Sequence, residues 1–141
     1  MTTALIDDQL LGSVLRGTTP RPLRNQRLFT TGHWYVRLCQ AVLRATERRG
    51  VLSGPFDALT PQLRDRAIGA VLDLPDHIGL LSLRDLAPTI GRLRARYDLN
   101  ILGVEAVAAA ATLDARVYLS TPSPRLEAAL AEQHLRVRVM P

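Results

Sequence analysis

Three acidic residues stand out because of the segments around them. Glu105 is the only ionisable residue between Ile101 and Leu113, a segment whose apolar composition indicates burial. A lone buried carboxylate is costly unless it is paired with a cation, hydrogen-bonded or protonated. Asp7 and Asp8 directly follow a short apolar run, residues 4–6. The types and positions of these three residues therefore point to a binding or catalytic site.

The chemistry that these carboxylates could perform depends on where the chain brings them. If residues 4–6 form a parallel strand, Asp7 and Asp8 lie just past its carboxyl end, where open α/β sheets bind ligands. Carboxylates that converge there, with Asp98 as a further candidate, suit a hard divalent cation such as Mg²⁺. The alternative is structural: Glu105 pairs with a neighbouring arginine, and Asp8 caps the first helix.

The basic residues are all arginines, 18 in number, and the net charge is +5. Arginine grips phosphate with a planar fork and stacks on bases, so RNA is a possible partner. The alternative is a coding bias from a GC-rich genome. The residues expected to contact RNA lie in a proline-containing loop, residues 17–27, and along one stripe of a following helix: Arg21, Arg24, Arg27, Arg37, Arg44 and Arg48.

Other kinds of site find little support. Cys39 is the single cysteine, and the three histidines are scattered, so no zinc-binding spacing occurs. No glycine-rich nucleotide loop is present. His33 is expected to be a packing residue. Trp34, beside Tyr35 and Arg37, could stack on a base, although a core position in its helix is the stronger expectation.

The composition indicates one globular domain over residues 1–141. Apolar residues make up 47% and charged residues 22%, and no apolar run approaches the length of a membrane helix. The chain opens without a basic and apolar leader, so we expect a cytoplasmic protein with no membrane partner. Strand and helix patterns alternate along the chain. This order predicts a three-layer α/β/α sandwich with a mostly parallel sheet and the first strand at its centre.

The boundaries of the expected elements follow from apolar periodicity and capping residues. Gly50 is expected to end the helix that starts at His33. Pro88 is expected in the first turn of its helix, where proline is tolerated. The expected strands are 4–6, 28–30, 78–83, 116–120 and 135–139, and the expected helices are 10–15, 33–48, 61–74, 86–97, 101–113 and 124–132.

Three motifs together resemble the PIN-domain family. Leu5-Ile6-Asp7-Asp8-Gln9-Leu10-Leu11 is similar to the first PIN motif, in which an aspartate follows an apolar strand. The stretch from Leu86 to Glu105, leading into an alanine-rich helix, resembles the region that carries a later acid. Val117-Tyr118-Leu119-Ser120-Thr121 resembles the strand that follows. The resemblance spans nearly the whole chain in element order, and the family includes the VapC-type toxins, which are Mg²⁺-dependent endoribonucleases.

The resemblance implies roles for individual residues. Asp7 matches the first metal-binding acid and Glu105 a later one, so both would be catalytic. The intermediate acid falls near Val36 or Arg37, where no carboxylate stands, and the last acid falls in the segment 120–123, Ser-Thr-Pro-Ser. An arginine at a metal centre opposes cation binding. We therefore expect Mg²⁺ to bind weakly or not at all, unless Asp8 or Asp98 fills the gap.

Two functions remain open from the sequence. One is a toxin-like, Mg²⁺-dependent endoribonuclease that uses Asp7 and Glu105. The other, which we favour, is a non-catalytic PIN-like module that binds RNA or a protein partner. The resemblance also implies a homodimer. Apolar residues in the helix at 60–74 and in the stretch Leu80 to Leu93 would supply its interface.

Overall fold

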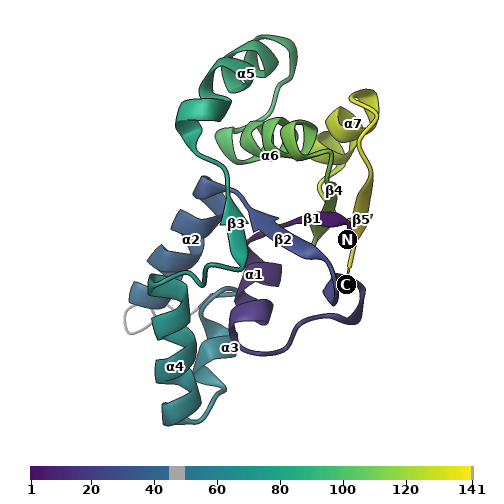
Figure 1. Ribbon diagram of the computed structural model, residues 1–141. Coiled ribbons are helices and arrows are strands. Elements are labelled where there is room, and N and C mark those ends of the chain that lie inside the picture. The colour runs from purple at the N-terminus through teal and green to yellow at the C-terminus, as the bar shows by residue number, and fades with distance from the viewer. Residues whose placement is uncertain (45–49, 141) are drawn as a thin grey trace.

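The computed structural model describes residues 1–44 and 50–140. Five parallel strands form one sheet in the order β3-β2-β1-β4-β5 (Figure 1). They are β1 (Thr3–Ile6), β2 (Arg27–Thr30), β3 (Ile78–Leu80), β4 (Arg116–Leu119) and β5 (Val137–Val139). The prediction of an α/β fold with a parallel sheet and a central first strand is confirmed.

Alternating side chains divide the interior into two cores. Ala4 and Ile6 of β1 face one side of the sheet, and Leu5 between them faces the other. On β4, Tyr118 lies in the first core and Val117 in the second. Because both faces of β1 are covered, its apolar residues form a continuous run and are fully buried.

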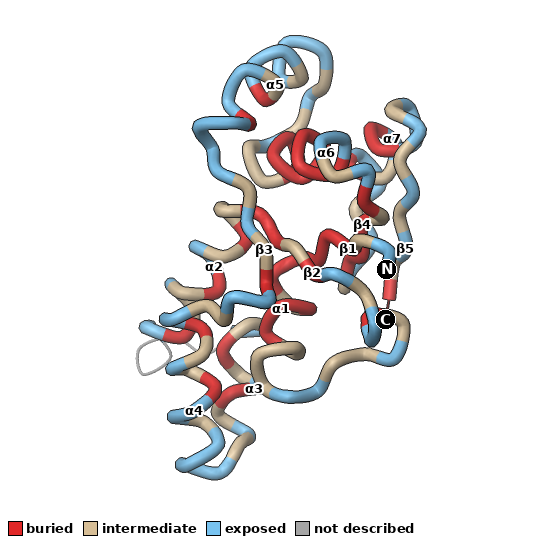
Figure 2. Tube along the Cα trace, in the orientation of Figure 1, coloured by how far each residue is buried: buried red, intermediate tan, exposed pale blue. Residues whose placement is uncertain are grey.

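Helices cover both faces of the sheet (Figure 1). On one face lie α1 (Asp8–Leu15), α2 (Gly32–Leu43), α3 (Gly54–Asp57) and α4 (Pro61–Leu72). On the other lie α5 (Leu83–Arg96), α6 (Ile101–Leu113) and α7 (Pro124–Glu132). Figure 2 shows that burial concentrates in the central strands β1 and β4 and along α6. The predicted three layers are therefore present.

The alanine-rich helix α6 is buried on nearly all sides, as its composition predicts. Every residue from Gly103 to Ala110 is buried. Asn100 caps its start, because the side-chain oxygen accepts the backbone N–H of Gly103 at 2.9 Å. Asp114 ends it in the left-handed conformation, with φ at 50°. These local signals place Glu105 in the second turn of a buried helix.

The edge strand β3 ends earlier than predicted. The sequence predicts a strand over 78–83, but β3 stops at Leu80 and α5 begins at Leu83. The cause is Ser82, whose hydroxyl accepts the backbone N–H of Arg84 at 3.1 Å and caps the helix. The placement of Pro88 in the first turn is also wrong. The helix begins at Leu83, before the predicted start at Leu86. Pro88 is therefore the sixth residue of α5 and lies inside the helix.

Other boundaries also differ from the predictions. The helix predicted over 33–48 ends at Leu43, so Gly50 does not end it, and residues 45–49 lie outside the described part of the chain. The short helix α3 and the 3₁₀ turn η1 (Arg21–Leu23) were not predicted. None of the helices described here is long and apolar enough to span a membrane.

Gly79 allows β2 and β3 to pair closely. It is the register partner of Phe29, and a Cβ added to it would lie 2.3 Å from Cε2 of the phenylalanine ring. No side chain can fit at that distance unless the ring moves. Glycine at this position is therefore required by packing rather than by backbone conformation.

Candidate functional site

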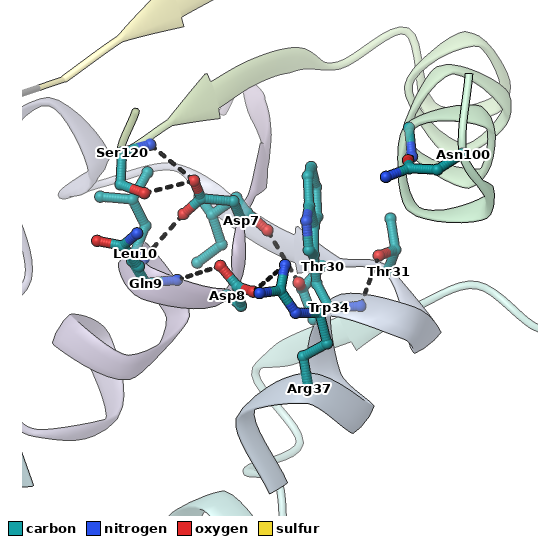
Figure 3. A network of polar contacts seen from close by, with 12 residues as sticks. Asp7, Asp8, Gln9, Leu10, Thr30, Thr31, Trp34, Arg37, Asn100 and Ser120 are labelled. Carbon is teal, nitrogen blue, oxygen red and sulfur yellow. Dashed lines mark hydrogen bonds and ion pairs between the residues drawn. The ribbon is translucent and has the colours of Figure 1, made fainter. Parts of the chain in front are cut away.

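The candidate site lies where the direction of chain connections reverses. After β1 the chain continues to β2 on one side, whereas β4 leads to β5 on the other. Open parallel sheets bind ligands at this reversal, outside the carboxyl ends of the strands. Asp7 follows β1 and Ser120 follows β4, so both residues stand at the reversal (Figure 3).

Asp7 joins the two strand ends. Its Oδ2 accepts the backbone N–H of Ser120 at 2.7 Å and the Ser120 hydroxyl at 2.6 Å. Its Oδ1 accepts the backbone N–H of Leu10 at 3.0 Å, which caps α1. Asp7, rather than Asp8, is therefore the N-cap of the first helix, which corrects the structural alternative drawn from the sequence. Three donors already stabilise this carboxylate.

Asp8 is the less satisfied of the two neighbouring carboxylates. Its Oδ1 accepts the backbone N–H of Gln9 at 2.8 Å. Its buried Oδ2 has no hydrogen bond, although Nη1 of Arg37 lies 3.3 Å away as an ion pair. Burial raises the pKa of Asp8, the charge of Asp7 raises it further, and Arg37 partly offsets both effects. Figure 3 shows the Arg37 guanidinium directed at Asp8.

A cavity of about 510 Å³ opens beside these residues. Asp7 and Asp8 line one wall, and Arg37 and Trp34 of α2 contribute another. Gln9, Val51, Leu52 and Leu119 add to the lining. The rest comes from the first residues of α6 and α7 and the loops before them: Asp98, Leu99, Asn100, Leu102, Gly103, Thr121, Ser123, Arg125 and Leu126. Helix N-termini and cations thus share this cavity with carboxylates.

Asp98 takes part in this cavity only at its exposed rim. Its Oδ2 lies 3.3 Å from Nη1 of Arg125, and both side chains are largely exposed, at 97% and 79%. Such a pair is well hydrated and contributes little to stability. The structure therefore brings Asp98 to the same cavity as Asp7 and Asp8, but gives it an arginine partner.

Glu105 is held elsewhere, at the start of α2. Its Oε2 accepts the backbone N–H of Gly32 at 3.1 Å, and its Oε1 accepts that of His33 at 2.9 Å. The same Oε1 lies 2.7 Å from Nδ1 of His33. The expected arginine partner of Glu105 is therefore wrong, and His33 is more than a packing residue. A fully buried carboxylate is stabilised here by a helix N-terminus.

These arrangements do not fit a Mg²⁺ ion. Both oxygens of Glu105 bind the start of α2, Asp7 is bonded to three protein donors, and a guanidinium faces Asp8. Among residues 1–44 and 50–140, no group of three or more His, Cys, Asp or Glu side chains is placed to hold a metal. The metal site implied by the PIN resemblance therefore has no ready set of ligands, and no catalytic step can be derived through it.

The predicted RNA-binding arginines fall into separate places. Arg21, Arg24 and Arg27 are exposed, on η1 and at the start of β2. Arg37 lines the cavity at the strand ends, and it lines an adjoining one together with Arg44. Arg48 lies outside the described residues.

Sequence reasoning missed Ser120 as a partner of Asp7 and Arg125 as a partner of Asp98. Ser120 could have been found, since the residues that follow neighbouring parallel strands meet at one edge of a sheet. The contact between Glu105 and His33 joins residues 72 apart in sequence, and no local pattern signals it.

No known protein family matches this chain, and no curated protein is significantly similar to it. A function is therefore inferred from the geometry at the strand ends.

Proposed function

We propose that this protein is a PIN-like domain that binds RNA without a working metal-dependent nuclease site. The sheet order 3-2-1-4-5 is consistent with PIN-like topology. The observation that carries the proposal is the 3.3 Å ion pair between Arg37 and Asp8. The pair puts a cation in the position where the PIN resemblance calls for a further acid.

The cavity at the strand ends offers positive groups to a phosphate chain. Arg37 and Arg125 line it, and their side chains are 52% and 79% exposed. The first turns of α6 and α7 add the positive ends of two helix dipoles. Phosphates that bind here would compete with Asp8 and Asp98 for the two guanidinium groups. This electrostatic binding fits the net charge of +5. We propose that the protein acts in the cytoplasm.

Base recognition contributes little in this proposal. Trp34 is only 5% exposed and packs in the core, so it offers no free face for stacking. Tyr118 is likewise 3% exposed, and Phe29, Tyr35 and Tyr97 are half-buried. Binding without exposed aromatic platforms is expected to depend on salt and to discriminate little between sequences.

Fluorescence anisotropy with a labelled single-stranded RNA in EDTA tests this proposal. The logarithm of the affinity should fall linearly with the logarithm of the salt concentration. Arg37→Gln should reduce the magnitude of that slope by roughly 0.7, the value for one lost phosphate contact on a single strand. The double variant Arg21→Ala/Arg24→Ala should weaken all RNA sequences alike.

Arg66→Gln is the matched control, since Arg66 is exposed on α4 and does not line the cavity. It should leave both affinity and slope nearly unchanged. An affinity that stays constant between low and physiological salt would refute the electrostatic account. Binding that is weakened equally by Arg37→Gln and Arg66→Gln would refute the assignment to this cavity.

A further inference from the structure

A second cavity of about 430 Å³ lies against α1, next to the first. The two cavities share Gln9, Val51 and Leu52 in their walls. The second is otherwise built from α1, the loop around η1 and the end of β5, with Pro55 of α3 and Ser120 after β4. Its size lies within the range of small-molecule sites, which begins at roughly 300 Å³.

The polar part of this cavity is centred on Arg16. Its Nη2 donates to the Ser13 hydroxyl at 3.2 Å, and its guanidinium lies 5.1 Å from the centre of the Phe56 ring. Gly12, one turn earlier in α1, leaves space for the side chain, since a Cβ there would lie 3.1 Å from Nη1. Three neighbours therefore position the guanidinium before any ligand arrives.

No acidic side chain among residues 1–44 and 50–140 forms an ion pair with Arg16. A guanidinium has five N–H donors, yet in the described part of the chain Arg16 makes one hydrogen bond and no ion pair. Partial burial lowers the pKa of Arg16, because desolvation disfavours its charged form. Arg138 lines the same cavity, and no Asp or Glu is among the lining residues. The cavity therefore presents two cations and no carboxylate.

Apart from Gln9 and Ser120, the remaining walls are apolar. Pro20 and Pro22 border the cavity from the basic loop, and Pro55, Leu10 and Met140 border it from other elements. Such walls accommodate a flat or ring-shaped group without hydrogen bonds. The exposed Arg21 lies between the two prolines and adds positive charge to this loop.

We propose that this cavity binds a phosphate monoester whose organic part is about the size of a nucleoside. The phosphate would lie against Arg16 and Arg138, and the organic part against the prolines. A phosphate monoester carries up to two negative charges near neutral pH, which matches two guanidinium groups better than a carboxylate does. A free mononucleotide and the phosphorylated end of an RNA both have this chemistry. The second source rests on the RNA binding proposed above, and the first does not.

Isothermal titration calorimetry at pH 7.5 with AMP, UMP, uridine and inorganic phosphate tests the proposal. AMP or UMP should bind, and uridine, which lacks the phosphate, should bind at least about tenfold more weakly. Arg16→Gln and Arg138→Gln should each reduce nucleotide affinity about tenfold or more. Arg66→Gln should have no effect.

Arg138 is exposed, so Arg138→Gln is expected to fold. This variant therefore tests the proposal even if Arg16→Gln does not fold. The proposal is overturned if neither nucleotide binds below millimolar concentration. It is also overturned if Arg138→Gln binds nucleotides as well as the wild type does.

Two RNA oligomers that differ only in a 5′-phosphate then separate the sources. A preference for the phosphorylated oligomer that disappears in Arg138→Gln would identify an RNA end as the ligand. Nucleotide binding with no RNA binding would support this cavity and refute the proposed RNA function. RNA binding with no response to nucleotides, to the 5′-phosphate or to Arg138→Gln would support that function and refute this inference.

Discussion

Glu105 and His33 are joined twice: the Oε1 atom of Glu105 accepts the backbone N–H of His33 at 2.9 Å and lies 2.7 Å from its Nδ1. With the third contact, to the backbone N–H of Gly32, the carboxylate of α6 satisfies the first donors of α2. The acid that the PIN resemblance assigns to a metal thus connects two helices.

Glu105→Gln should lower the free energy of unfolding by about 2 kcal/mol, because glutamine keeps the shape but loses the charge and presents donors to donors. Urea unfolding at pH 7 measures the loss. The matched control is Glu132→Gln, which removes an exposed ion pair with Arg96 and should cost at most about 1 kcal/mol. Equal losses in the two variants would contradict the structural role of Glu105.

Asp8 should make stability depend on pH in a defined direction. Because its pKa is raised above the ordinary value of 3.8, the folded protein holds this proton more tightly than the unfolded chain. Its contribution to stability is therefore present at low pH and is lost as pH rises from 3.8 through the raised folded pKa. Asp8→Asn should accordingly gain stability relative to the wild type at pH 7, and the gain should shrink towards pH 3.

Urea unfolding of Asp8→Asn and wild type at several pH values checks this prediction. Asp65→Asn, on the exposed surface of α4, is the control and should change stability by less than about 0.5 kcal/mol. A stability difference between Asp8→Asn and the wild type that grows as pH falls would mean that the assigned direction is wrong.

Gly79→Ala should destabilise the protein by about 1–3 kcal/mol, because the new Cβ overlaps the Phe29 ring. Gly69→Ala is the matched control: it lies in α4 with open space around it and should stabilise by up to about 1 kcal/mol through helix propensity. Thermal unfolding compares the two. A Gly79→Ala protein as stable as the wild type would contradict the close pairing of β2 and β3.

Self-association remains a prediction, and the structure offers apolar surface for it. Leu72 of α4, Leu80 of β3 and Leu83 of α5 are 47%, 41% and 44% exposed, in the two stretches expected to form an interface. We expect a dimer at micromolar concentration, measured by light scattering. Leu80→Asp together with Leu83→Asp should dissociate it, and Leu43→Asp on α2 should not. A wild-type protein of monomer mass at all concentrations would refute the prediction.

Features with a local cause could be predicted from the sequence. The apolar run at 4–6 predicts a central strand, and the composition of 101–113 predicts a buried helix, because burial on all sides leaves no polar stripe. The early end of β3 was missed because Leu81 continues its apolar run and the serine cap at Ser82 competes with it.

The partners of the acids could not be predicted in the same way. Asp7 meets Ser120, and Glu105 meets His33, across 113 and 72 residues of sequence. Such pairings depend on which strand end or helix N-terminus the fold brings to each carboxylate. The absence of an acid at Arg37 could be read from the sequence, but its ion pair with Asp8 required the packing of α2 against α1.

The most direct test of the central claim compares RNA affinity and RNA integrity in Mg²⁺ with those in EDTA, at one ionic strength. If Arg37 binds RNA phosphates and the site performs no Mg²⁺-dependent cleavage, the affinity for RNA should be the same in both buffers. The RNA should also remain intact in both. Cleavage of the RNA in Mg²⁺ but not in EDTA, abolished by Asp7→Asn, would contradict this account and establish the endoribonuclease instead.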